Sequence, residues 1–326
     1  MQIILDTRGL QVSVRNGCFL FTTDSESRIV HPDRIDSILV CSPCRVSSPA
    51  LILAVTFQIP FVICDSCGRP VVRTWSPKLI NTSKLRRLQY QFSYKRDSIE
   101  WVENLIRYKI EGQKSNLLFV VKYNTSLKNE VSKALNAVDN ILSRLNMAND
   151  VSLIEYKKKI LFAEAFAASF YWKLLGLALP LRFQFSNRVK KNPQDVFNNC
   201  INYLYGMLQN QIETAVLSFG LDPALGIMHR DGYKMPSLVF DLMEPFRPII
   251  DRFLFSIFTD GLMGLDILEE KRSKIVISKS GRKNLIILFN KKLDTRCYFR
   301  GTGASLRNHI LTETKLLVSK IKEQDK

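Results

Sequence analysis

The chain has 326 residues, 46% of them hydrophobic and 24% charged, which is the composition of a soluble globular protein long enough for two domains. Its start mixes short apolar runs with charged residues, and no apolar run approaches the roughly 20 residues of a membrane helix, so we expect neither a secretory signal nor a membrane span but a cytoplasmic protein. The 47 Lys and Arg against 30 Asp and Glu give a formal net charge of +17, which favours a polyanionic partner over an inert basic surface.

The N-terminal part of the chain is predicted to be rich in β-strands. Short runs of Ile, Val and Phe alternate there with turn residues such as Asn16 and Gly17. Strands this short favour a small sandwich-like sheet, which we assign to residues 1–76. The predicted strands cover residues 1–5, 10–14, 18–22, 37–41 and 60–64, with one short helix at 49–56.

The rest of the chain is predicted to be helical. Residues 77–84 form the expected linker, and helical periodicity follows it. Helices are expected at 84–94, 97–122, 126–144, 150–177, 193–219, 237–262 and 304–323, with a short β-like segment near 274–278 and a further helix from 280. The predicted fold class is therefore α+β multidomain, with a small N-terminal β-sheet domain and a larger all-α C-terminal domain at 85–326.

A single carboxylate, Glu164, lies in the apolar stripe of one predicted helix. Its neighbours at helical spacing include Ile160, Ala167 and Tyr171. A lone buried carboxylate is costly unless it is paired with a cation or a metal ion. Two interpretations of Glu164 therefore stand: a metal ligand, or one partner of an ion pair with an Arg or Lys of another helix.

A histidine and an acidic pair follow along the chain. Gly220 is predicted to be the C′ residue of a long helix, which places His229 in the next loop. Ser237 is predicted to cap a helix from which Asp241 and Glu244 project on one face. Such a pair repels unless a cation lies between the charges, although two solvated acids near a helix N-terminus are the alternative. One buried Glu, one His and one acidic pair make a candidate site for Mn²⁺ or Mg²⁺, which stabilises charge on a phosphate.

These segments resemble the core signature of CRISPR-associated protein 1, the integrase of CRISPR adaptation. The resemblance is carried by Cys200 to Gly206, Gly220 to Gly226, His229 and Pro236 to Asp251. Other stretches agree with the family's β domain and helices in the same order: Ile35 to Ile38, Ile59 to Ile63, Asp65 to Arg69, Arg107 to Gln113, Ala163 to Trp172 and Ser278 to Lys283. The match covers essentially the whole chain.

The resemblance implies a ligand set and a reaction. The family's metal ligands fall on Glu164, His229 and Glu244, with Asp241 as a helper or alternative ligand. In the implied reaction, the 3′-hydroxyl of a captured DNA fragment attacks a phosphodiester at the edge of a CRISPR repeat, with Mn²⁺ or Mg²⁺ held over that phosphate. The implied partners are double-stranded DNA fragments, CRISPR repeat DNA, a second copy of the chain in a homodimer, and CRISPR-associated protein 2. No membrane partner is expected.

Two basic groups are candidates for DNA contact, with a solvated basic face as the alternative for each. One group opens the first long helix and consists of Lys84, Arg86 and Arg87. The other is a loop that follows the helix of Glu164 and is favoured because it is close in sequence to the candidate metal site; it consists of Asn187, Arg188, Lys190 and Lys191.

Two Cys-x-x-Cys pairs depart from the family's usual pattern. Cys41 and Cys44 are followed after 19 residues by Cys64 and Cys67, a spacing found in four-thiolate zinc sites. Cys41 and Cys64 fall where the family has strand residues, however, and free cysteines also pack as small apolar side chains. A structural zinc ion is therefore the less favoured of the two interpretations.

Two rival functions stay open beside the integrase. One is a stand-alone metal-dependent nuclease that acts on branched or double-stranded DNA with water as its nucleophile. The other is a non-catalytic DNA-capture scaffold, against which the complete set of Glu164, His229 and Glu244 argues.

Overall fold

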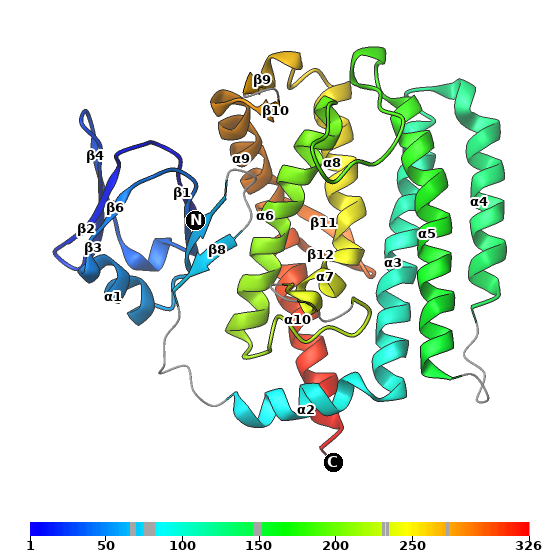
Figure 1. The fold of residues 1–326 in the computed structure, drawn as a ribbon, viewed down its shortest axis with the longest axis horizontal. Coiled ribbons are helices and arrows are strands. Elements are labelled where there is room, and N and C mark those ends of the chain that lie inside the picture. Colours follow the sequence, from blue (N-terminus) through cyan, green and yellow to red (C-terminus); the bar gives the residue numbers. More distant parts are fainter. Residues whose placement is uncertain are drawn as a thin grey trace. The chain divides into compact units, whose positions relative to one another are not determined.

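The computed structural model describes residues 1–65, 70–74, 82–145, 152–229, 232, 235–271 and 274–325. The chain divides into two compact units, Met1–Thr82 and Ser83–Lys326 (Figure 1). The first unit is built on β-sheets and the second is mostly helical, so the predicted fold class is confirmed. Most of the predicted linker lies outside the described residues.

The N-terminal unit contains two four-stranded sheets and one helix, α1 (Ser48–Thr56). The first sheet has the order β1 (Gln2–Leu5), β5 (Ser37–Val40), β7 (Phe61–Cys64) and β8 (Pro70–Arg73). The second has the order β4 (Ser27–Val30), β3 (Cys18–Thr22), β2 (Gln11–Arg15) and β6 (Arg45–Val46). Buried side chains of both sheets and of α1 form one core, as expected for a sandwich-like domain.

The C-terminal unit is built of long helices, with two short hairpins and several 3₁₀ turns. The helices are α2 (Ser83–Ser93), α3 (Arg96–Val120), α4 (Lys128–Ser143), α5 (Leu153–Ala178), α6 (Val196–Ser218), α7 (Ser237–Met243), α8 (Arg247–Thr259), α9 (Lys279–Asp294) and α10 (Leu306–Glu323). The hairpins pair β9 (Leu268–Lys271) with β10 (Lys274–Ile277) and β11 (Arg296–Phe299) with β12 (Thr302–Ser305). The 3₁₀ turn that matters for the site is η4 (Glu244–Phe246).

Three helices run alongside one another in this unit. α5 packs along α3 and is covered on another side by α4 (Figure 1). Contrary to the sequence prediction, α5 is long and apolar enough to cross a membrane by length and composition alone. Its buried residues, among them Tyr156, Ile160 and Tyr171, face its neighbours, as in the core helix of a folded domain.

The prediction of a single helix at 237–262 is wrong. α7 ends at Met243, the chain passes through η4, and α8 begins at Arg247. Pro245 and Pro248 lack the backbone N–H that a continuous helix needs, so the helix is interrupted there. The interruption places Glu244 at the junction of two helices. The prediction that Ser237 caps this helix is also wrong. Ser237 is the first residue of α7, and Pro236 occupies the N-cap position without a side-chain hydrogen bond.

Candidate metal centre

Glu164 lies on α5 opposite a lysine of α3. The Lys109 ammonium forms an ion pair with Glu164 Oε1, and Lys109 Nζ also lies 2.5 Å from Glu244 Oε2. The side chain of Lys109 is 9% exposed and that of Glu164 is 23% exposed, so the pair lies at the edge of the core. One cation thus joins carboxylates from α5 and η4. The structure thus shows the second interpretation of Glu164, as the partner of a Lys on another helix.

Glu244 is the most strongly held carboxylate of the site. Its side chain is 4% exposed, and its Oε1 accepts a 2.9 Å hydrogen bond from Arg247 Nε, one turn further on. Burial alone would raise the pKa of Glu244, but the charges of Arg247 and Lys109 hold it at about 2. Glu244 is therefore ionised throughout the physiological range.

His229 is oriented by Asp241. The His229 Nδ1 and Asp241 Oδ1 atoms lie 2.7 Å apart, and Asp241 is fully buried at the second turn of α7. The Asp241 carboxylate also accepts the backbone N–H groups of residues 227, 228 and 229 at 2.6, 3.0 and 3.0 Å. With Nδ1 directed at a carboxylate, the Nε2 lone pair of His229 is left for another partner, and Nε2 lies 4.0 Å from Glu244 Oε1.

The loop that carries His229 is held from several sides. Gly220 has a φ of +82° and ends α6, as predicted. Gln89 of α2 donates to the Asp222 carbonyl at 2.9 Å and accepts from its backbone N–H at 2.8 Å. A Cβ atom at Gly226 would lie 2.5 Å from Ser237 Cβ, so only glycine allows this approach to α7. The loop is thereby fixed before any ligand binds.

The residues at this site fit a divalent cation. Glu244 Oε2 is buried, and among the described residues the Lys109 ammonium is the cation in contact with it. Among those residues no group of three or more His, Cys, Asp and Glu side chains is gathered tightly enough to hold an ion as they stand. The two glutamates do converge on the Lys109 ammonium, and His229 Nε2 lies 4.0 Å from Glu244 Oε1. An ion there would be held by Glu164, Glu244 and His229.

Behind the site lies a buried polar network that the sequence reading did not identify. Asp251 of α8 accepts hydrogen bonds from Tyr205 at 2.5 Å and from Tyr171 at 3.0 Å. The Arg247 guanidinium lies 4.6 Å from the centre of the Tyr205 ring, which connects this network to Glu244. The available signal was an acid among apolar residues at helical spacing in α8, the same signal that identified Glu164.

Replacing Asp251 by Asn tests this network through its pH dependence. Burial raises the pKa of Asp251 to about 6, from an ordinary value of 3.8. Because the pKa of Asp251 is higher in the folded state, the stabilisation that its protonation gives is fully present below the pKa of the unfolded state. This stabilisation is lost as the pH rises through the folded-state pKa of about 6. The stability of Asp251→Asn relative to the wild type should therefore increase between pH 4 and pH 7, by on the order of 3 kcal/mol. Urea denaturation at several pH values measures this, with exposed Asp260→Asn as a control that should show no such trend.

The favoured DNA-contact loop lies near the carboxylates. Arg188 is fixed by hydrogen bonds to Asn198 Oδ1 at 3.0 Å and Asn202 Oδ1 at 2.6 Å. Loss of hydration and the charges of Arg247 and Arg188 lower the pKa of Lys190. Lys190 is exposed and makes no ion pair within the described part of the chain, and the neighbouring residues Asn187 and Lys191 are exposed as well. Exposed cations next to a carboxylate site are suited to a phosphate.

The other predicted DNA-contact group has partners within the chain. Lys84 pairs with Asp325 at 2.5 Å, and Arg86 Nε donates to the Gly220 carbonyl at 3.4 Å. Arg87 is exposed on the same helix, α2. These contacts weaken the case for Lys84 and Arg86 as DNA ligands, although the assignment of both groups stays a prediction.

The described cysteines do not gather into a four-thiolate set. Cys41 and Cys64 come directly after Val40 and Ile63, which are paired in the parallel strands β5 and β7. The side chains of the two cysteines form a hydrogen bond. The hydrogen bond with Cys41 and, after it, burial hold the pKa of Cys64 well above its usual range. Cys44 instead packs against the core of the N-terminal unit, and Cys67 lies outside the described residues. The zinc site stays a prediction.

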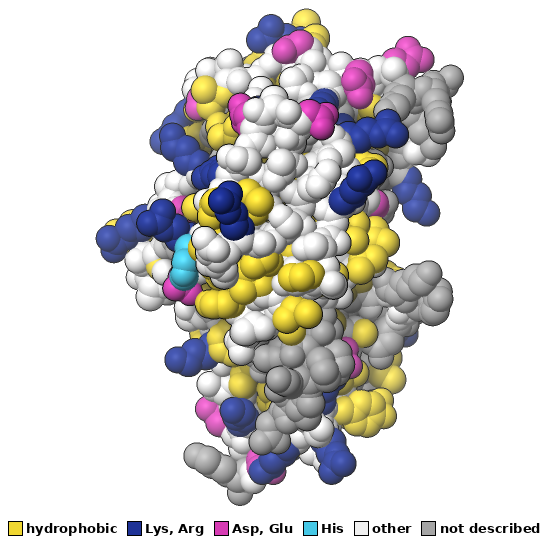
Figure 2. All heavy atoms as spheres, turned by 90° about the vertical axis from the view of Figure 1, so that its left-hand side faces the viewer, with side chains coloured by type: hydrophobic (Ala, Val, Ile, Leu, Met, Phe, Trp, Pro, Cys, Tyr) yellow, Lys and Arg dark blue, Asp and Glu magenta, His cyan; other side chains and the backbone are white. Residues whose placement is uncertain are grey.

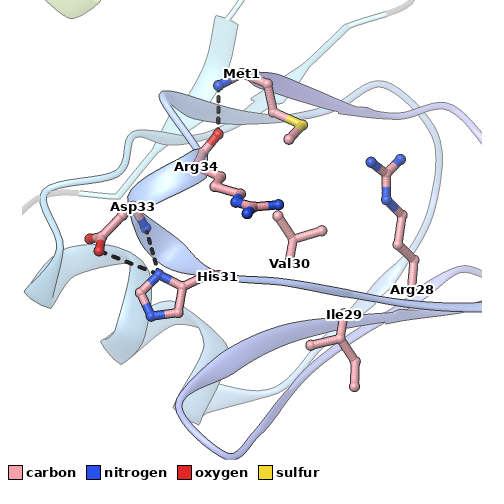
Figure 3. Close-up of a pocket in the computed structure, with 7 residues that line it drawn as sticks. All are labelled: Met1, Arg28, Ile29, Val30, His31, Asp33 and Arg34. Carbon is pink, nitrogen blue, oxygen red and sulfur yellow. Dashed lines mark hydrogen bonds and ion pairs between the residues drawn. The ribbon is translucent and has the colours of Figure 1, made fainter.

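A pocket in the N-terminal unit is separate from this chemistry. In Figure 3, the Arg34 side chain extends toward Val30, while His31 turns to Asp33, 3.4 Å away. The pocket is lined by Met1, Arg28, Ile29, Val30, His31, Asp33 and Arg34, none of which was a predicted site residue.

On the face drawn in Figure 2, hydrophobic side chains gather in the middle and Lys and Arg side chains are spread around them.

Comparison with known proteins shows the family to which the chain belongs. The model of the family described as CRISPR associated protein Cas1 matches residues 3–291. The CRISPR-associated endonuclease Cas1 of Korarchaeum cryptofilum is 30% identical over 262 residues, which cover 78% of this chain and 76% of that protein. A casposase bound to its integration product has a TM-score of 0.83 at 21% identity, covering 99% of this chain and 91% of its own. One chain of a Cas6-RT-Cas1–Cas2 complex has a TM-score of 0.82 at 18% identity, and the match covers 99% of this chain and 35% of that one.

Proposed function

Since the chain belongs to the Cas1 family, we propose that it is a metal-dependent DNA integrase of CRISPR adaptation, which inserts short DNA fragments as new spacers into the CRISPR array. The observation that carries the proposal is the convergence of two carboxylates from separate elements, Glu164 and Glu244, on one cation position, with His229 Nε2 4.0 Å from Glu244 Oε1. A pure binding module has no need of such a costly arrangement.

The residues of the site have different roles in the proposed strand-transfer step. A bound Mn²⁺ or Mg²⁺ would supply charge neutralisation at the phosphate and activation of the attacking 3′-hydroxyl. Glu164, His229 and Glu244 would hold that ion, and the contact of Asp241 with Nδ1 would keep His229 in the tautomer that leaves Nε2 free. Arg247 fixes the direction of the Glu244 carboxylate. No protein nucleophile is required, because the DNA supplies the hydroxyl.

The proposed partners are DNA, a second copy of the chain and Cas2. The formal charge of +17 and the exposed Lys190 near the site support DNA binding. One solved neighbour is a complex that contains Cas2, and another is a casposase bound to its integration product. We place the protein in the cytoplasm, where its DNA target lies.

Strand transfer is the direct test. A labelled short duplex should be joined to supercoiled DNA carrying a CRISPR repeat in the presence of Mn²⁺ or Mg²⁺ and Cas2, and His229→Ala should lower the rate by at least about 10²-fold. Exposed His31→Ala is the matched control and should react normally.

The rival functions give different results in the same assay. Cleavage without joining would favour a stand-alone nuclease, consistent with relatives that are named endonucleases. Tight DNA binding with neither reaction would favour a capture scaffold.

A further inference from the structure

A buried ammonium lies where two metal ligands of the proposed site converge. Lys109 contacts Glu164 on α5 and Glu244 in η4, and it reaches both from a third element, α3. We propose that Lys109 is a built-in competitor of the metal ion, a tethered cation that neutralises the two glutamates in the ion-free protein and must leave their shared position when an ion binds. This inference rests on the proposed function, because it concerns the same site.

The burial of Glu244 makes a neutralising cation necessary at this position. Glu244 is almost completely enclosed, and two ionised carboxylates facing one point repel each other strongly at low local polarity. Arg247 supplies one positive charge against the two negative charges of Glu164 and Glu244. Its Nε atom bonds Glu244 Oε1, while Glu244 Oε2 faces Lys109. Without Lys109, the ion-free site would therefore hold an uncompensated negative charge.

Competition follows from geometry. Lys109 Nζ and a divalent ion would use the same oxygens, Glu164 Oε1 and Glu244 Oε2, and two cations cannot share one position. The lysine side chain has several rotatable bonds, so its ammonium can withdraw while the helix stays in place. Each ion that binds must first break two ion pairs, which weakens its apparent affinity and keeps the free protein from holding an ion tightly.

The test measures metal binding without DNA and without turnover. Mn²⁺ is titrated into the wild type and Lys109→Met, and free Mn²⁺ is followed by electron paramagnetic resonance. Lys109→Met should bind Mn²⁺ at least tenfold more tightly, because the competing cation is gone. Lys114→Met is the matched control, since Lys114 lies on the same helix and pairs with Glu111 at 3.0 Å and Asp139 at 2.6 Å, away from the site. Its affinity should equal that of the wild type.

Thermal denaturation separates competition from a merely structural role. In a chelator, Lys109→Met should melt below the wild type, and saturating Mn²⁺ should raise its melting temperature more than that of the wild type. Unchanged or weaker Mn²⁺ affinity in Lys109→Met would overturn the inference. If neither the wild type nor Lys109→Met binds Mn²⁺ more tightly than Glu164→Gln, the proposed metal site itself fails, which is a different result.

Discussion

Glu244→Gln is expected to abolish strand transfer and to destabilise the fold, whereas Glu164→Gln abolishes transfer and leaves the fold nearly intact. Both changes remove a charged ligand from the proposed ion, so each should slow transfer by at least about 10²–10³-fold. Only Glu244 is 4% exposed and paired with two buried cations, Lys109 and Arg247. Removing its charge leaves Arg247 without its carboxylate partner and Lys109 with Glu164 alone, which costs about 3–5 kcal/mol. Glu164 is 23% exposed, and water there limits the cost to about 1 kcal/mol.

Chemical denaturation alongside the transfer assay measures both effects. Glu323→Gln, at the exposed end of α10, is the control and should be neutral in stability and in rate. Adding Lys109→Met to Glu244→Gln should recover part of the lost stability, because it removes the positive charge in excess of the one that Glu164 neutralises. A Glu244→Gln protein as stable as the wild type would contradict the assignment of Glu244 as the counter-charge of Lys109 and Arg247.

Local patterning was sufficient for most of the fold. Strands such as β3, where buried and partly exposed residues alternate, and amphipathic helices such as α4 follow directly from the spacing of their apolar residues. The prediction missed β9, β11 and β12 in the C-terminal unit and three strands in the N-terminal unit, and those three lack that signal. β4 is largely exposed, β6 has two residues, and β8 begins with Pro70, so pairing with neighbouring strands and not sequence pattern defines them.

The site was only partly visible in the sequence, because its members come from separate elements. Glu164 was identified as an acid in an apolar stripe, and the same rule identifies Lys109, which lies at helical spacing with buried Leu105, Ile106 and Gln113 on α3. The sequence could not show that these two side chains meet, since that depends on how α3 packs on α5. Nor could it separate the roles of Asp241 and Glu244, which the end of α7 directs to different partners.

Asp241 and Glu244 had been treated as one acidic pair, yet their surroundings give them different roles. Glu244 faces Lys109 and Arg247, while both oxygens of Asp241 accept hydrogen bonds from the loop at 227–229. Among the described residues, the donors to Asp241 belong to the segment that carries His229. Asp241 is therefore positioned to act on an ion through His229 and not by direct ligation.

Asp241→Asn should loosen the His229 loop and weaken metal binding, although Asn has nearly the same shape. An amide has one acceptor oxygen, so it cannot serve all four donors, and its NH₂ group would face backbone N–H groups. Losing charge-assisted hydrogen bonds in a buried site should cost about 3 kcal/mol of stability, and releasing the His229 ring should weaken Mn²⁺ affinity by about 10–100-fold. His229→Gln should weaken Mn²⁺ binding with little loss of stability, since that side chain is 31% exposed. Denaturation and Mn²⁺ titration of both variants measure this, and wild-type affinity in Asp241→Asn would show that His229 needs no orienting carboxylate.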